Sequence, residues 1–125
     1  MIKPTESELE ILQLLWQKGS CTVREINEEL SKKKESEIGY TTTLKTMQIM
    51  HEKGLISRDD TAKTHIFTAV ATESDTQKQL LDRFMDSVFR GSAMKMVMQA
   101  LGNQHTTAEE IAEIKKLIDE MENKK

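Results

Sequence analysis

The residues with the clearest capacity for chemistry lie together in residues 40–68. A helical pattern covers about residues 40–53, and the spacing of Thr43, Met47 and Met50 turns one of its sides toward a core. The opposite side carries hydroxyl, amide and charged groups, on Thr41, Thr42, Lys45, Gln48 and Glu52. Such groups can form hydrogen bonds with base edges, so this helix has the chemistry needed to read a DNA major groove.

A β-hairpin is predicted directly after this helix. Gly54 supplies the left-handed residue that ends the helix, and two β-type segments follow at residues 55–58 and 64–68. The turn between them, residues 59–63, is polar. A groove-reading helix followed by a hairpin is typical of a winged helix, in which the hairpin lies along the phosphates.

Two earlier helices must position this unit. Thr5 with Glu8, and Thr22 with Glu25, have the spacing of capping boxes, in which each side chain bonds a backbone N–H of the first turn. Apolar residues at helical spacing follow each cap, and Gly19 is expected to end the first helix.

From about residue 74 the pattern is helical. Three amphipathic helices are predicted at about residues 75–90, 92–101 and 107–123. Three such helices in roughly 50 residues cannot bury all their apolar faces alone. We therefore expect them to dimerise with a second chain through Leu81, Phe84, Met85, Val88, Val97, Met98, Leu101, Ile114, Ile118 and Met121.

The predicted fold class is mainly α with a small β-hairpin. Residues 1–72 are expected to form an N-terminal winged helix-turn-helix DNA-binding domain, and residues 73–125 a C-terminal three-helix dimerisation region. No apolar run approaches the roughly 18 residues of a membrane span, and no signal peptide is recognisable. The sequence therefore predicts no membrane insertion and a cytoplasmic location.

The charge balance limits how DNA could be bound. The chain has 18 Lys and Arg against 21 Asp and Glu, whereas many nucleic-acid-binding domains are strongly basic. Positive charge must therefore be local, and the candidates are Lys45, Lys53, Arg58 and Lys63, with Lys32 to Lys34 nearby. The acidic pair Asp59 and Asp60 lies close to where phosphates are expected.

The sequence argues against an enzyme. His51, His65 and His105 belong to different elements and lack the spacing of metal ligands. There is no Gly-rich phosphate loop and no nucleophile elbow. Cys21, the single cysteine, is expected to act as a small apolar residue in a short strand before the second helix. No cofactor and no metal are predicted.

A protein-interaction module with winged-helix architecture but no DNA contact is the other alternative. The acidic pI near 5.7 and the apolar Ile49 on the third helix favour it. The threonine-rich face of that helix argues against it, because the centre of a protein interface is rich in aromatic and aliphatic anchors.

Motifs over nearly the whole chain share one resemblance. They lie at residues 5–12 with Leu15 and Trp16, at residues 22–26, at residues 39–44 with 52–56, and at residues 89–92. In this order and spacing they resemble the BlaI/MecI penicillinase-repressor family of bacterial transcription regulators. The resemblance implies a homodimeric repressor on a short inverted repeat of double-stranded operator DNA. It also implies control of β-lactam-type resistance or cell-envelope stress genes.

The resemblance also indicates which residues meet DNA. Gln48 can pair bidentately with adenine, and threonine methyl groups can pack on thymine. Ile49 stands where relatives often carry arginine, so one contact is expected to be missing. The DNA-binding residues expected on these grounds are Tyr40, Thr41, Thr42, Lys45 and Gln48 in the helix, with Arg58 and Lys63 in the hairpin.

Release of the repressor would follow one of two routes known in related proteins. In the first, a membrane sensor-protease leads to cleavage after the glycine break, and the bond in register here is Gln99–Ala100. The Asn-Phe pair of the best-known relatives is absent at this point. In the second, copper binds paired cysteines near the C-terminus, a route that the single Cys21 excludes.

Overall fold

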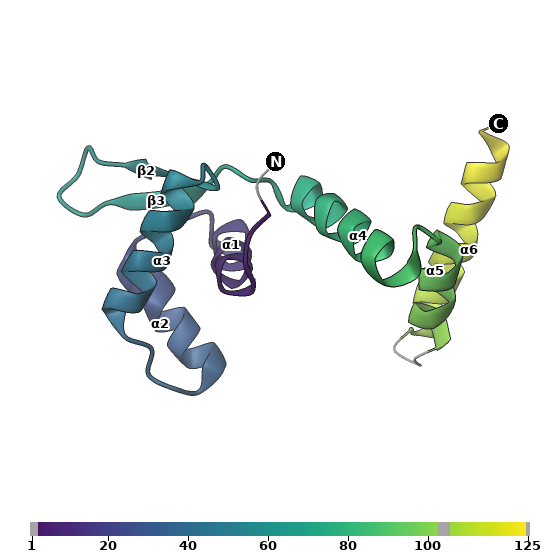
Figure 1. Ribbon diagram of the computed structural model, residues 1–125, viewed down its shortest axis with the longest axis horizontal. Helices are drawn as coiled ribbons and strands as arrows, with labels where there is room; N and C mark the ends of the chain where they lie inside the picture. Colours follow the sequence, from purple (N-terminus) through teal and green to yellow (C-terminus); the bar gives the residue numbers. More distant parts are fainter. Residues whose placement is uncertain (1–2, 103–105, 125) are drawn as a thin grey trace. The chain divides into compact units, whose positions relative to one another are not determined.

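The computed structural model describes residues 3–102 and 106–124 (Figure 1). The mainly helical class with a small antiparallel sheet, predicted from the sequence, is confirmed. His105, named above among the histidines that lack metal-ligand spacing, lies outside the described residues. The elements are α1 (Glu6–Lys18), β1 (Ser20–Cys21), α2 (Val23–Lys34), α3 (Tyr40–Glu52), β2 (Ile56–Asp59), β3 (Ile66–Ala69), α4 (Glu73–Phe89), α5 (Ala93–Gly102) and α6 (Ala108–Asn123).

The chain forms two compact units, Met1–Leu80 and Leu81–Lys125. The division falls inside α4, because the beginning of this helix belongs to the first unit. Thr76 is buried there, and the indole Nε1–H of Trp16 donates to the carbonyl of Ala71 at 2.8 Å. A functional boundary at residue 72 stays a prediction.

Both capping boxes predicted near the N-terminus are formed. The backbone N–H of Glu8 donates to Thr5 Oγ1 at 3.2 Å, and the N–H of Thr5 donates to Glu8 Oε1 at 2.9 Å. The same pair of bonds joins Thr22 and Glu25 at the start of α2. Because these bonds satisfy N–H groups that the first turn leaves free, they fix where α1 and α2 begin.

The sheet has three antiparallel strands in the order β1–β3–β2. Cys21 pairs with Phe67 on one side of β3, and Arg58 pairs with Phe67 on the other. The short strand predicted before the second helix is therefore β1, which pairs with β3 at the edge of the sheet opposite β2. Strand β2 begins one residue later than predicted, because the Leu55 N–H donates to the carbonyl of Met50 and the Leu55 carbonyl accepts from Val70 and Ala71.

The core of the first unit collects one apolar face from each of its three leading helices and the inner side of the sheet. Each of these side chains is almost fully buried, and each Val, Leu, Ile, Met or Phe among them contributes about 1.5–3 kcal/mol of apolar burial. They are Ile11, Leu12, Leu14, Leu15, Cys21, Val23, Ile26, Leu30, Met47, Met50, Leu55, Ile56 and Phe67.

The second unit has no comparable core. Within residues 81–102 and 106–124, no side chain is buried. Large apolar side chains are exposed on all three helices, and the Phe84 ring packs edge-on against the Phe89 ring at a centroid distance of 5.7 Å. In the described part of the chain, no helix is long and apolar enough to cross a membrane.

An ion pair with a buried carboxylate and a partly exposed lysine joins α1 to the end of α3. The Lys53 ammonium lies 2.9 Å from both carboxylate oxygens of Glu8, whose side chain is buried. Burial by itself raises the pKa of Glu8, but the hydrogen bond from the Thr5 backbone and the Lys53 charge outweigh it, and the net pKa is lowered. Lys53 was expected among the cations available to DNA, but in the structure its ammonium group is bound to Glu8.

Glu8→Gln should lower the free energy of unfolding by about 1–3 kcal/mol at about pH 7, because Lys53 then faces a neutral group. Since the folded pKa of Glu8 lies below its ordinary value of 4.5, its contribution is present above that value and is lost as the pH falls through the folded pKa. The difference between parent and variant should therefore shrink in acid, as measured by urea unfolding across pH.

Glu10→Gln is the matched control for this variant. It breaks another α1 ion pair, Glu10 with Lys34 at 3.2 Å, but one that is partly exposed, and should cost at most about 1 kcal/mol. Equal effects of the two substitutions at all pH values would contradict the role given to Glu8.

Candidate nucleic-acid interface

Helix α3 presents a polar outer face because its other face is locked in the core. Thr43, Met47 and Met50 are buried, as their spacing predicts. At about 100° of rotation per residue, the opposite side of the helix falls on Thr41, Lys45, Gln48 and Glu52, and all four are exposed. These four residues are called the outer ridge.

A side-chain amide fixes the turn that leads into α3. Asn27 Nδ2, on α2, donates to the carbonyl of Ile38 at 2.8 Å and to Thr43 Oγ1 at 3.0 Å. The Ile38 N–H in turn donates to Ser31 Oγ at 3.1 Å. Because Thr43 is also a core residue, this network couples the rotation of α3 to the position of α2.

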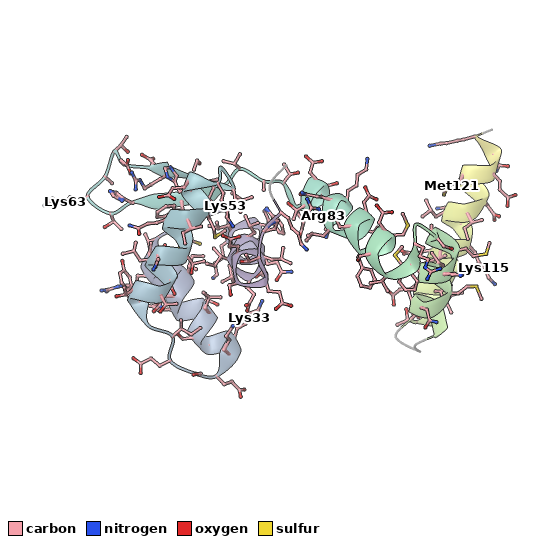
Figure 2. All side chains as sticks on the ribbon, in the orientation of Figure 1. Lys33, Lys53, Lys63, Arg83, Lys115 and Met121 are labelled. Atoms are coloured by element: carbon pink, nitrogen blue, oxygen red, sulfur yellow. The ribbon has the colours of Figure 1, made fainter. Side chains whose placement is uncertain are left out.

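A groove of 740 Å³ lies beside the outer ridge, between the start of α2, helix α3 and the β2–β3 hairpin. It contains four of the seven DNA-binding residues predicted from the sequence, Tyr40, Gln48, Arg58 and Lys63. Figure 2 shows Lys63 in the loop that joins the two hairpin strands. The other lining residues are Thr22, Val23, Arg24, Leu44, Thr64, His65 and Phe67.

The remaining three predicted residues lie elsewhere on α3. Thr41 and Lys45 are on the outer ridge and do not line the groove. Thr42 faces a separate hollow of 220 Å³ together with Ser7, Ile11 and Leu30 of the first two helices, among others. The predicted face is therefore wider than a single groove, and Thr42 lies at its far edge.

Arg24 is a lining residue that the sequence interpretation missed. It stands in the first turn of α2, where a cation is unfavourable because the helix dipole already places partial positive charge there. An exposed arginine at such a position suggests a use outside the helix. That signal was present in the sequence, but only the structure brings Arg24 to the hairpin and α3.

Several of the basic residues are already paired within the protein. Lys34 contacts Glu10, and Lys32 and Lys18 both contact Glu29. In the hairpin, Arg58 Nε lies 2.7 Å from Asp60 Oδ1. Across residues 3–102 and 106–124, no ion pair engages Arg24, Lys45 or Lys63, so these three cations remain available to an anionic partner.

The site offers hydrogen-bonding and cationic groups rather than reactive ones. Among the described residues, no three His, Cys, Asp or Glu side chains are grouped so as to hold a metal ion. Cys21 is buried, and burial raises the pKa of its thiol. The arrangement suits recognition of an extended anion.

The chain is similar in sequence to a known protein family and to its members. The penicillinase repressor family matches residues 4–120. The penicillinase repressor of Bacillus licheniformis is 27% identical over 122 residues, covering 97% of this chain and 93% of that protein. The methicillin resistance regulatory protein MecI of Staphylococcus aureus is 23% identical over 115 residues, covering 92% of each.

A solved structure supports the fold independently. The hsRosR-S4 complex aligns with a TM-score of 0.56 at 13% identity, covering 95% of this chain and 90% of that chain. At that identity the likeness concerns the fold alone.

Asn27→Ala should lower the free energy of unfolding by about 1–3 kcal/mol, because the Ile38 carbonyl and the buried Thr43 hydroxyl both lose their donor. Urea unfolding monitored by circular dichroism measures the loss. Glu28→Ala, at the exposed neighbouring position of α2, is the control. Equal stability of the two variants would show that the network does not hold α3.

Proposed function

The chain belongs to the penicillinase repressor family and is thus a DNA-binding transcriptional repressor rather than an enzyme; from this premise we propose that it acts as a homodimer on a short inverted-repeat operator. Each protomer inserts α3 into the major groove of one half-site. The β2–β3 hairpin follows the neighbouring phosphates. This function is exerted in the cytoplasm, where the chromosome lies.

The observation that carries the proposal is the outer ridge standing next to a cationic groove. The Gln48 amide can pair with adenine, the Thr41 methyl can pack on thymine, and Lys45 can bind guanine or a phosphate. Arg24 and Lys63, which line the groove from α2 and from the hairpin loop, are suited to phosphates, since neither is used in an ion pair among the described residues.

Dimerisation is supported by the exposed apolar side chains of the second unit. Phe84 on α4, Val97 on α5 and Ile118 on α6 are all 44–51% exposed. Met85 and Ile114 are half-buried. A second copy of the same helices would remove these faces from water, and two linked recognition helices would bind an inverted repeat far more tightly than one.

The alternative of a protein-interaction module draws its support from Ile49, which is 39% exposed beside the outer ridge. One isolated apolar side chain is a weak interface core. The family's repressors and the polar ridge favour DNA.

Control of the repressor forms the last part of the proposal. The regulated genes are of the β-lactam-resistance or cell-envelope stress class, and a membrane sensor-protease partner leads to cleavage at Gln99–Ala100. Both residues are exposed in the last turns of α5. Since a protease binds its substrate in extended form, this helix end must open first. The Gly102 that ends α5 favours such opening.

Lys45→Ala combined with Gln48→Ala should weaken DNA binding by about tenfold or more, because both side chains reach base edges or phosphates in the proposed complex. The probe is a duplex that the parent protein selects from a random-sequence library, and affinity is measured by a gel-shift assay. Helicity and dimer mass should be unchanged.

Lys78→Ala combined with Gln17→Ala is the matched control, since it removes the same two residue types from exposed positions outside the ridge and groove. Unchanged affinity in the ridge variant would refute the assigned face. A parent affinity that does not fall between low and moderate salt would contradict groove binding itself.

Phe84→Asp should convert the dimer to monomers, because it places a charge in the shared apolar face. Phe84 is 51% exposed in the single chain, so helicity should survive. Light scattering gives the mass, and binding to the full inverted repeat should fall with dimerisation.

Ser87→Asp is the control, since it adds the same charge on α4 at an exposed position about 110° from the centre of the apolar face. A Phe84→Asp protein that stays dimeric would exclude this interface.

A further inference from the structure

The acidic wing is the feature that DNA binding leaves unexplained. Asp59 and Asp60 follow one another at the end of β2, beside residues proposed to meet phosphates. Two carboxylates there should repel DNA. In the structure, the two carboxylates make different contacts within the hairpin.

Asp59 shapes the turn. Its Oδ1 accepts from the backbone N–H of Thr61 at 2.9 Å and from the Thr61 hydroxyl at 2.7 Å. These two hydrogen bonds lower the pKa of the Asp59 carboxyl. An amide oxygen at the same position could accept the same bonds, so the turn needs the acceptor and does not need the negative charge.

Asp60 holds a guanidinium. Its Oδ1 lies 2.7 Å from Arg58 Nε and 3.6 Å from His65 Nε2. Arg58 and His65 line the groove beside α3, whereas Asp60 is not among the described lining residues. The carboxylate therefore contacts Arg58 without itself facing the groove.

The backbone of Arg58 is also held firmly. Arg58 pairs across the ladder with Phe67, a buried core residue. The flexible part of Arg58 is thus its side chain alone. The contact with Asp60 uses the Nε–H, only one of the five N–H donors of a guanidinium, so the terminal nitrogens can still bind a phosphate bidentately.

We propose that Asp60 is a positioning residue for DNA binding, which holds the Arg58 guanidinium in the groove so that its terminal nitrogens meet a backbone phosphate. The proposal rests on the proposed function. An arginine ordered before binding loses less side-chain freedom when the complex forms. The affinity gained by ordering Arg58 opposes the affinity lost through repulsion between the Asp60 carboxylate and DNA. Whether removal of Asp60 lowers or raises DNA affinity shows which of these two effects is larger.

Asp60→Ala should weaken binding to the selected duplex by about two- to tenfold for each wing, the range expected for leaving one long side chain unordered. The slope of log affinity against log salt should stay close to that of the parent, because Arg58 still neutralises its phosphate, whereas Arg58→Ala removes that contact and should make the slope shallower. Asp59→Asn is the matched control. It removes a neighbouring charge but keeps the Thr61 acceptor, and it should leave affinity equal or higher.

A double-mutant cycle separates positioning from damage to the hairpin. In an Arg58→Ala background, Asp60→Ala should cause no further loss of affinity, because there is no guanidinium left to hold. A loss that persists in that background would show a structural role and overturn the proposal.

The remaining outcomes are also distinct. Affinity that rises with Asp60→Ala would mean that simple repulsion dominates, and only this inference would fail. A parent protein that enriches no duplex would overturn the proposed function, and this inference with it.

Discussion

The rotation of α3 about its own axis is the constraint on which the rest of the interface depends. Met47 and Met50 are fully buried, and each contributes about 1.5–3 kcal/mol to holding that rotation. A turn of one residue, about 100°, would expose them and bring Gln48 toward the core. Thr43 further restricts the rotation of α3, because its hydroxyl oxygen accepts a hydrogen bond from the Asn27 amide. The residues that fill the core therefore also determine which groups the opposite side offers to a partner.

Ion pairs within the protein likewise limit the positive charge that is available to DNA. Lys53 ties α3 to the buried Glu8, while Lys18, Lys32 and Lys34 are paired with glutamates on the surface. Beside the ridge and groove, Arg24, Lys45 and Lys63 are the cations without an ion pair among the described residues, so few phosphate contacts are expected there and attraction to DNA of arbitrary sequence should be small. In the proposed complex, such a repressor gains its affinity from base contacts, from the Arg58 side chain held by Asp60, and from dimerisation. The net charge of −3 is thus compatible with DNA binding.

Local rules in the sequence predicted most of the fold. Thr5 and Thr22 each begin a helix through a capping box, as expected, because the partners lie only three residues apart, and Thr107 begins α6 in the same way. Contacts between distant residues were not predictable in this way. Lys53 meets Glu8 across 45 positions, and Arg24 reaches the wing groove only because α2 and the hairpin converge on α3. The sequence pattern places Thr42 beside Thr41 on the polar side of the helix because both are hydroxyl residues. In the structure, Thr42 instead lines the separate 220 Å³ hollow.

The two units differ in a way that connects stability with regulation. The first has a dense core of its own, but no described side chain after residue 80 is buried. Helices without a core are marginal in water, so the second unit must obtain its stability from the proposed dimer contact. Dimerisation and DNA binding are then linked, because a weaker contact in the second unit lowers the population of paired recognition helices without any change in the first. In the proposed dimer, a signal that disturbs α5 or α6 would therefore release DNA from a distance, with the outer ridge unaltered. Such coupling between dimerisation and DNA binding would allow release from DNA without any change in the DNA-binding unit.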